Sequence, residues 1–192
     1  MKKMHDEDFY HLPWITYVNN LLNNCGMSFL WNNYQDYDIR WLQLSLERKL
    51  LDISLQNWNS SVNNNILCSN YRMFKTNFTL EKYFSLLSYS DYITFVKFRC
   101  GNHSLPISNI RYNRLSNDID RMCKKCNLND QGDEFHYILV CPYFSAKRKI
   151  YIKNYYYTRP NGIKFSQLFN SKNNSELKNL IKFIKYVNSE FP

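Results

Sequence analysis

The 192-residue sequence predicts a mostly α-helical protein. Apolar residues recur at spacings of three and four in several segments, and Pro and Gly stand at the ends of some of them. No segment alternates convincingly between apolar and polar residues, and the sequence has no internal repeat. This length suits one domain of ordinary size or two small ones. We expect a helical domain over residues 1–101 and a second domain over residues 102–192.

Two helices are expected in the first sixty residues. The first begins at Pro13 and ends before Gly26, the usual places for these two residue types around a helix. Cys25 belongs to its apolar face, where we interpret it as a small hydrophobic residue. The second helix begins after Asp38, which can cap its N-terminus, and ends near Trp58.

The middle of the chain predicts shorter elements. The polar, Asn-rich residues 60–78 are the best candidate for a linker. Two short helices are expected after it, over residues 79–87 and 90–100, and Gly101 ends the second. The irregular residues 103–121 predict an extended, exposed connector.

Three helical segments are expected after this connector. Pro142 begins the first, which reaches about residue 155, and a short helical turn covers about residues 163–169. Apolar residues at helical spacing predict the last helix over residues 175–188.

Charge is unevenly distributed along the chain. Residues 1–96 contain 8 Lys and Arg against 9 Asp and Glu, whereas residues 97–192 contain 17 against 7. The net charge of +9 therefore comes entirely from the second half. Clustered Lys and Arg release the counterions condensed on nucleic-acid phosphates, so this asymmetry favours a polyanionic partner. A solvated basic face that serves solubility is the alternative.

Composition excludes several classes of protein. No apolar run approaches the about 18 residues of a membrane-spanning helix, and the charged residues 1–8 lead into no apolar segment of a secretory signal. Six cysteines without such a signal indicate reduced thiols rather than a disulfide framework. We expect a nuclear or cytoplasmic protein that is not secreted, contacts no membrane and has no small-molecule substrate.

One cluster of metal-binding residue types stands out. Cys123 and Cys126 are separated by two residues, a spacing that lets both thiolates face one ion. His136 follows Cys126 after nine residues, and Cys141 follows His136 after four more. Together they can complete a tetrahedral zinc site. Such a site is structural, because protein fills all four coordination positions. The sequence thus predicts one structural zinc ion; the alternative is a set of buried cysteines and a core histidine.

The residues around this cluster suit such a geometry. Gly132 and Asp133 predict a turn whose carboxylate caps a short helix over residues 135–139. Pro142 disfavours helical backbone at the residue before it, Cys141, so we expect the helix to break there. The break lets Cys141 turn toward the ion, because side chains five positions apart on an unbroken helix diverge by roughly 140°.

The other histidines and two of the other cysteines have no partner at ligand spacing. We expect His5, His11 and His103 to be surface residues, and neither Cys68 nor Cys100 to be a ligand.

Basic and aromatic residues flank the predicted zinc segment on both sides. Phosphate pairing combined with stacking of bases on exposed aromatic rings is a common way to hold single-stranded nucleic acid. The expected phosphate contacts are Arg111, Arg114, Arg121, Lys124, Lys125, Lys147, Arg148 and Arg159. Some of the neighbouring tyrosines could instead face the core.

Short motifs across most of the chain carry a resemblance to a known family. They are Leu12-Pro13-Trp14, Cys25-Gly26-Met27-Ser28, Lys97-Phe98-Arg99-Cys100-Gly101-Asn102-His103, Leu105-Pro106-Ile107, Gly132-Asp133-Glu134-Phe135-His136-Tyr137, Cys141-Pro142, Tyr156-Tyr157-Thr158-Arg159-Pro160 and Lys164-Phe165-Ser166. With them, the sequence resembles the C-terminal region of reverse transcriptases encoded by non-LTR (LINE-like) retrotransposons of invertebrate animals, downstream of the polymerase.

This resemblance implies a function. Members of the family copy their RNA into nicked target DNA. The resemblance implies that Cys123, Cys126, His136 and Cys141 belong to the zinc-binding segment of the family. It also implies that this segment binds RNA or target DNA. No adjacent aspartate pair occurs, so the carboxylates that hold polymerase magnesium are absent and we expect no enzyme.

The predicted architecture is a helical N-terminal part followed by a small Cys3His zinc knuckle packed among helices. We expect it to bind RNA or DNA without catalysis, with the polymerase portion of the same element as a further partner. Two alternatives stay open: a zinc-stabilised protein-interaction module that docks on a polymerase or host protein, and an inactive relic of an element.

Overall fold

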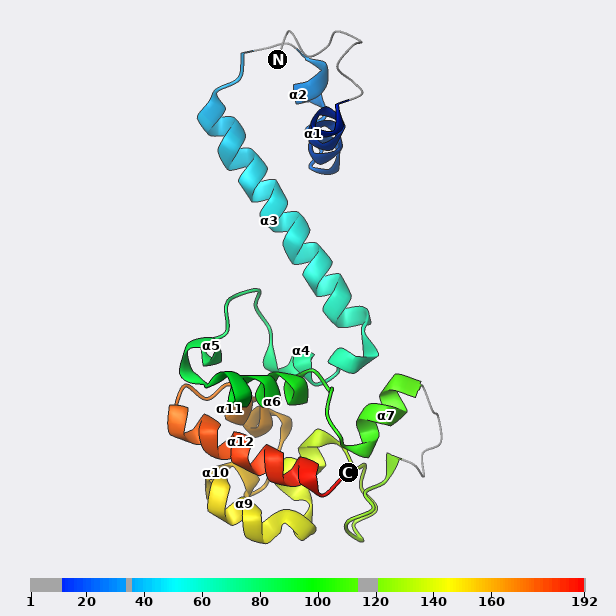
Figure 1. Cartoon of the computed structure of the whole chain (residues 1–192), viewed down its shortest axis with the longest axis vertical. Coiled ribbons are helices and arrows are strands. Elements are labelled where there is room, and N and C mark those ends of the chain that lie inside the picture. The colour runs from blue at the N-terminus through cyan, green and yellow to red at the C-terminus, as the bar shows by residue number, and fades with distance from the viewer. Residues whose placement is uncertain (1–11, 34–35, 114–120, 192) are drawn as a thin grey trace. The chain divides into compact units, whose positions relative to one another are not determined.

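The computed structural model describes residues 12–33, 36–113 and 121–191, and it is mostly helical as expected (Figure 1). Within these residues there is no strand, only one isolated antiparallel bridge between Met122 and Gln131. None of the described helices is both long enough and apolar enough to cross a membrane. The chain divides into two compact units, residues 1–60 and 61–192.

Unit 1 contains α1 (Pro13–Asn24), α2 (Phe29–Asn32) and most of α3 (Ile39–Asn64). Gly26 ends α1 with a φ of 67°, a left-handed conformation that glycine adopts without strain. The N–H groups of Gly26 and Met27 donate to the carbonyl oxygens of Asn23 and Leu22, which forms a Schellman motif. The oxygen Oδ1 of Asp38 accepts the N–H of Arg40 at 2.8 Å and so caps α3 as predicted.

The core of unit 1 is small. Leu22, Met27 and Leu30 are buried together with Cys25, which confirms the interpretation of this cysteine as a small hydrophobic residue. Apolar residues of α3 pack against this cluster.

Unit 2 is larger and holds every residue of the predicted zinc site. Its long helices are capped by side chains: Ser88 accepts the Asp91 N–H, and Asn173 accepts the N–H groups of Ser175 and Glu176. Its elements are η3 (Ile66–Cys68), α4 (Tyr71–Phe74), α5 (Tyr83–Leu86), α6 (Tyr89–Arg99), α7 (Pro106–Asn113), the π-helix η4 (His136–Val140), η5 (Pro142–Phe144), α9 (Ser145–Tyr151), α10 (Asn154–Tyr157), α11 (Gly162–Phe169) and α12 (Asn174–Ser189).

Helix α12 forms the centre of this unit and packs against α6, α9 and α11 (Figure 1). Its buried face includes Leu180 and Ile184, each fully buried. From α6, Phe95 and Phe98 both stack on Phe169, with ring centroids 5.6 and 5.8 Å away. The core is therefore an aromatic layer between α6, α11 and α12.

Several elements differ from those predicted. Residues 106–113 form helix α7 rather than part of an extended connector, because Ile107 and Ile110 are buried at helical spacing. The single helix expected over residues 142–155 is three short ones, since the backbone is extended at Ile152. The compact units divide at residue 60 and not at residue 101, because α6 packs on α12.

The aromatic layer yields a test of this core. Phe95→Ala should lower the free energy of unfolding of unit 2 by about 3–5 kcal/mol, because the side chain is fully buried and leaves a cavity. Ile163→Ala, at a position 71% exposed, should change it by less than about 0.5 kcal/mol. Denaturant unfolding followed by near-ultraviolet circular dichroism measures both, and equal losses in the two variants would contradict the packing described.

Candidate metal centre

The first two cysteines lie on a tight loop. Cys123 and Cys126 belong to the segment 121–131, which is closed on itself by the N–H of Cys123 donating to the Asp130 carbonyl oxygen at 2.9 Å. Inside the loop, the N–H of Lys125 donates to the Cys123 sulfur at 3.4 Å. A backbone hydrogen bond within the loop therefore positions the Cys123 sulfur.

The histidine and the third cysteine lie on a π-turn. The N–H of Cys141 donates to the His136 carbonyl oxygen at 2.7 Å, a pairing of residues five apart that defines η4. Asp133 caps the start of this segment as predicted, accepting the His136 N–H at 2.8 Å. The wider turn brings two residues five positions apart toward one face. The helix also breaks at Cys141 as predicted, since the backbone there is not helical (φ −49°, ψ 120°).

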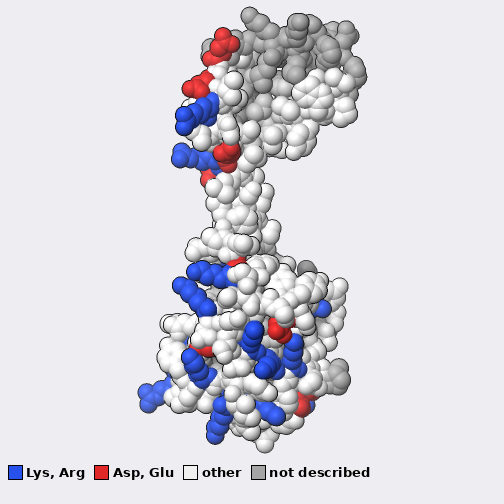
Figure 2. Space-filling model, turned by 60° about the vertical axis from the view of Figure 1, so that its left-hand side comes forward, with Lys and Arg blue, Asp and Glu red and all other residues white. Residues whose placement is uncertain are grey.

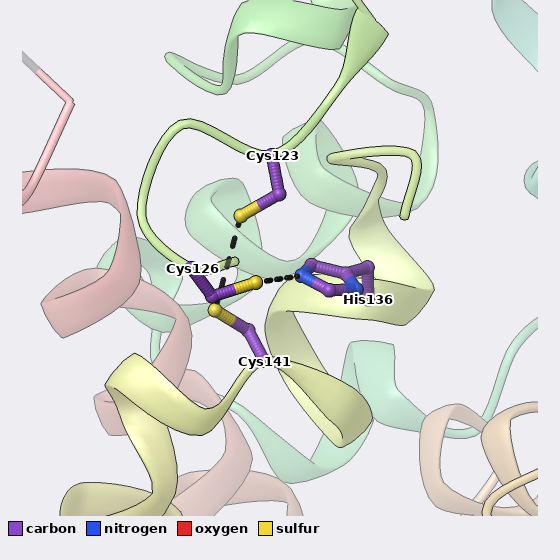
Figure 3. Close-up of side chains that lie close together, drawn as sticks. All are labelled: Cys123, Cys126, His136 and Cys141. Carbon is purple, nitrogen blue, oxygen red and sulfur yellow. Dashed lines mark hydrogen bonds between the residues drawn. The ribbon is translucent and has the colours of Figure 1, made fainter. Parts of the chain in front are cut away.

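These elements bring all four predicted ligands together. Their donor atoms lie within 4.8 Å of one another (Figure 3). The Cys123 and Cys141 sulfurs are 3.9 Å apart, and the Cys126 sulfur is 3.3 Å from Nε2 of His136. A tetrahedral ion with metal–sulfur bonds of about 2.3 Å requires sulfur–sulfur edges of about 3.8 Å. The cluster has the spacing to hold one metal ion.

Burial at this position favours neutral thiols, so thiolates form here only together with a cation. Cys141 and His136 are almost fully buried, and Cys123 is 8% exposed. Burial, together with the neighbouring thiols, raises the pKa of Cys141 to about 12, so thiolates here need a compensating positive charge. Burial lowers the pKa of His136, which keeps the imidazole neutral and able to bind a metal.

The carboxylate of Asp130 lies near the ring of His136. Nδ1 of His136 makes no hydrogen bond and lies 3.7 Å from the Asp130 carboxylate. A carboxylate behind the free ring nitrogen commonly orients a metal-binding histidine.

Glycine is required beside the site. A Cβ added to Gly132 would lie 2.5 Å from the Tyr137 hydroxyl oxygen and 3.1 Å from the Cys123 Cα. The loop that carries the first cysteines can thus approach the π-turn only where the side chain is a hydrogen atom.

Arg148 is a buried part of this centre and not the exposed phosphate contact expected from the sequence. It is 4% exposed. Its Nε donates to the carbonyl oxygen of Ile138 at 2.7 Å, and its terminal nitrogen donates to those of Tyr137 at 3.3 Å and Cys141 at 2.7 Å. The π-turn frees the Tyr137 oxygen, and Pro142, which lacks an N–H, frees that of Ile138. Arg148 therefore satisfies acceptors that the turn leaves open.

A second cluster, around the buried Glu134, supports the same segment and includes Arg111, an expected phosphate contact, and His103, an expected surface residue. The carboxylate of Glu134 binds Arg111 at 2.5 and 3.0 Å and Nε2 of His103 at 2.8 Å. The side chain of His103 is 1% exposed, so it is not a surface residue. Although burial alone would raise it, the pKa of Glu134 falls to about 2 because of His103 and Arg111.

The other expected phosphate contacts differ in exposure. Lys124, Lys147 and Arg159 are exposed, and Arg121 is half-buried. Arg114 lies outside the described residues. Lys125 is 28% exposed, lies 3.8 Å from the Glu190 carboxylate, and stands over the rings of Tyr143 and Phe191 at 5.3 and 5.1 Å.

Comparison of the chain with protein-family models, with curated proteins and with solved structures finds no match. The site is therefore interpreted from its own chemistry. Four converging donors, three of them on buried residues and one on the partly buried Cys126, are enough to complete a coordination shell without water.

Removing one ligand tests the metal centre. Cys123→Ser should reduce bound metal well below one ion per chain and lower the free energy of unfolding of unit 2, because structural sites of this kind contribute on the order of 10 kcal/mol to folding. Cys68→Ser changes a cysteine of the same unit that lies outside the cluster, and should retain the metal. Elemental analysis and thermal unfolding measure the two effects; equal metal content in both variants would refute the site.

Replacing the buried arginine tests its structural role. Arg148→Met keeps the side-chain length but leaves buried carbonyl oxygens without donors, so the free energy of unfolding should fall by about 3 kcal/mol. Lys149→Met, at the exposed neighbouring position, should cost less than about 0.5 kcal/mol. Urea unfolding of both variants gives the comparison, and a stable Arg148→Met protein would show that these hydrogen bonds contribute little.

Proposed function

We propose that unit 2 is a non-catalytic nucleic-acid-binding module organised by one structural zinc ion. We propose further that the chain is the C-terminal portion of a non-LTR retrotransposon reverse transcriptase, which holds template RNA or target DNA beside the polymerase of the same element. The observation that carries the proposal is the closed Cys3His cluster within a strongly basic unit.

Zinc suits the donor set better than other biological cations. Three thiolates and one imidazole are soft or borderline donors, whereas calcium and magnesium select oxygen. Four protein donors within 4.8 Å match the tetrahedral shell of a structural zinc site and reserve no position for a reacting water. The ion's role is thus to join the loop at Cys123 and Cys126 to the π-turn.

Charge supports a polyanionic partner. Unit 2 contains 20 Lys and Arg against 9 Asp and Glu, a net charge of +11, whereas unit 1 has a net charge of −2. Lys and Arg side chains outnumber acidic ones on the face of unit 2 in Figure 2. A charge of this size on one compact unit attracts nucleic acid by releasing counterions.

Exposed aromatic rings accompany the basic residues near the knuckle. Tyr143 is 50% exposed and Tyr155 is 56% exposed. Lys125 stands over the first ring, and Lys164 stands over the second at 4.9 Å. Pairs of this kind offer a cation for phosphate and a ring face for an unpaired base.

The family assignment is supported by how the resembling motifs relate in space. The motif of residues 97–103 and that of residues 132–137 are joined by the buried contact of His103 with Glu134. The second motif also carries the Asp133 cap and the ligand His136. The residues of both motifs thus contribute to one structural unit around the metal centre.

Salt-dependent binding tests the function. The zinc-quantified chain should bind labelled single-stranded RNA or duplex DNA with an affinity that falls steeply between about 50 and 200 mM salt, and a chelator should abolish binding. Lys124→Gln/Lys147→Gln should weaken binding about tenfold and lower the salt slope by up to about 2, because two exposed phosphate contacts are lost. Fluorescence anisotropy measures both quantities.

The matched control carries the same change of charge elsewhere on unit 2. Lys178→Gln/Lys182→Gln alters two exposed residues of α12 and should change the affinity less than about twofold. A chain that holds zinc but binds neither nucleic acid would contradict the proposal and favour the protein-docking alternative.

A further inference from the structure

A second site in unit 2 lies apart from the metal cluster. A cavity of about 360 Å³ is lined by residues 74–77 and 79–83, by Arg99 at the end of α6, and by residues 169–172 after α11. None of the four metal ligands lines it. Its volume falls within the range of small-molecule sites, which is about 300–1,000 Å³.

Arg99 lies in the wall of this cavity with unused hydrogen-bonding capacity. The residue is 1% exposed, and its Nε has no hydrogen-bond partner. Its terminal nitrogens donate to the Phe169 carbonyl oxygen at 3.2 Å, to Oδ1 of Asn170 at 3.5 Å and to Glu81 at 3.5 Å. A guanidinium has five N–H donors, so two of them are unused, and two of the three bonds are long.

Positive charge around the cavity is not balanced. Glu81 is the one carboxylate in the lining, and it pairs with both Arg99 and the buried Lys75, the latter at 3.0 Å. Lys82 and Lys172 also line the cavity and are exposed. Four cations thus face one anion.

Aromatic rings surround the same guanidinium. Its carbon lies over the rings of Phe74 at 5.3 Å, Tyr83 at 5.1 Å and Phe95 at 5.6 Å. Two of these rings, Phe74 and Tyr83, also line the cavity. The rings leave the cation poorly hydrated, and a poorly hydrated cation pairs more strongly with an anion.

A purely structural role explains only part of this arrangement. The bonds from Arg99 to Phe169 and Asn170 cap the C-terminus of α11, where a cation is favoured. That role accounts neither for the unpartnered Nε nor for the two lysines at the rim. The residual charge and the free donors point to an anionic ligand.

We propose that this cavity binds a phosphate monoester, with Arg99 as the buried anchor and Lys82 and Lys172 as the rim contacts. The phosphate is that of a strand terminus or of a free nucleotide, which share the same dianionic group. Planar guanidinium and mobile ammonium groups bind phosphate in complementary ways, the first by paired hydrogen bonds and the second as a point charge. The site is independent of the metal centre and does not rest on the proposed function.

The experiment uses the full zinc-loaded chain and follows the Nε–H signal of Arg99 by nuclear magnetic resonance. Adenosine 5′-monophosphate should shift this signal and adenosine should not. A 5′-phosphorylated oligonucleotide compared with its 5′-hydroxyl form distinguishes a strand terminus from a free nucleotide as the source. A shift with adenosine 5′-monophosphate alone assigns a nucleotide site, and one with the phosphorylated strand assigns a strand-end site.

Paired variants complete the test. Lys82→Gln/Lys172→Gln should weaken binding of adenosine 5′-monophosphate about tenfold, or about 1.4 kcal/mol. Lys178→Gln/Lys182→Gln removes the same charge from positions that do not line the cavity and should leave this affinity within about twofold. The proposal is overturned if the Arg99 signal does not move, or if both variants lose affinity equally. Lys124 and Lys147 lie outside this cavity. The Lys124→Gln/Lys147→Gln variant should therefore still bind adenosine 5′-monophosphate even if it no longer binds nucleic acid. This outcome distinguishes the phosphate site from the proposed function.

Discussion

The metal centre depends on one backbone hydrogen bond, from the Cys141 N–H to the His136 carbonyl oxygen. It makes the turn one residue wider than an α-turn and so places two ligands five positions apart on the same face. Pro142 prevents the helix from continuing with regular bonds, because it has no N–H to offer the Ile138 carbonyl oxygen. The wide turn would be costly if the freed carbonyl oxygens were buried alone. The guanidinium of Arg148 supplies their donors, so ligand geometry and buried charge form a single arrangement.

Arg148, Arg111 and His103 thus support the segment that carries His136 and Cys141 rather than forming an exposed basic surface. Arg148 donates to carbonyl oxygens of the π-turn up to Cys141 at its end, while Arg111 and His103 bind the Glu134 carboxylate just before its start. Removing one member of such a set leaves an uncompensated buried charge or acceptor, which costs more than the intact set contributes. These contacts fix both ends of the segment that carries His136 and Cys141. A metal ion would join this segment to the loop that carries Cys123 and Cys126.

Local patterns predicted what depends on local physics. Helical periodicity, the Asp38 and Asp133 caps, the Gly26 stop and the ligand spacing at Cys123 and Cys126 all involve residues within one turn or loop, and the structure confirms them. Whether an individual arginine is buried or exposed could not be predicted from local patterns. Whether Arg148 points to solvent or to freed carbonyls depends on a π-turn that no periodicity reveals. A usable signal existed for Arg99, which stands four residues after Phe95 on the buried face of α6.

The structure divides the basic residues of unit 2 into two groups with different chemistry. Arg99, Arg111 and Arg148 are directed inward, where a planar fork of donors satisfies fixed oxygens. The exposed cations near the knuckle are mostly lysines, whose ammonium groups act as mobile point charges. Arginine forks are the side chains that most often identify guanine by paired hydrogen bonds, whereas lysine contacts to phosphate carry no sequence information. A nucleic-acid surface built on Lys124 and Lys147 would therefore hold the backbone of a strand, and selectivity would have to come from strand form or strand ends rather than from base sequence.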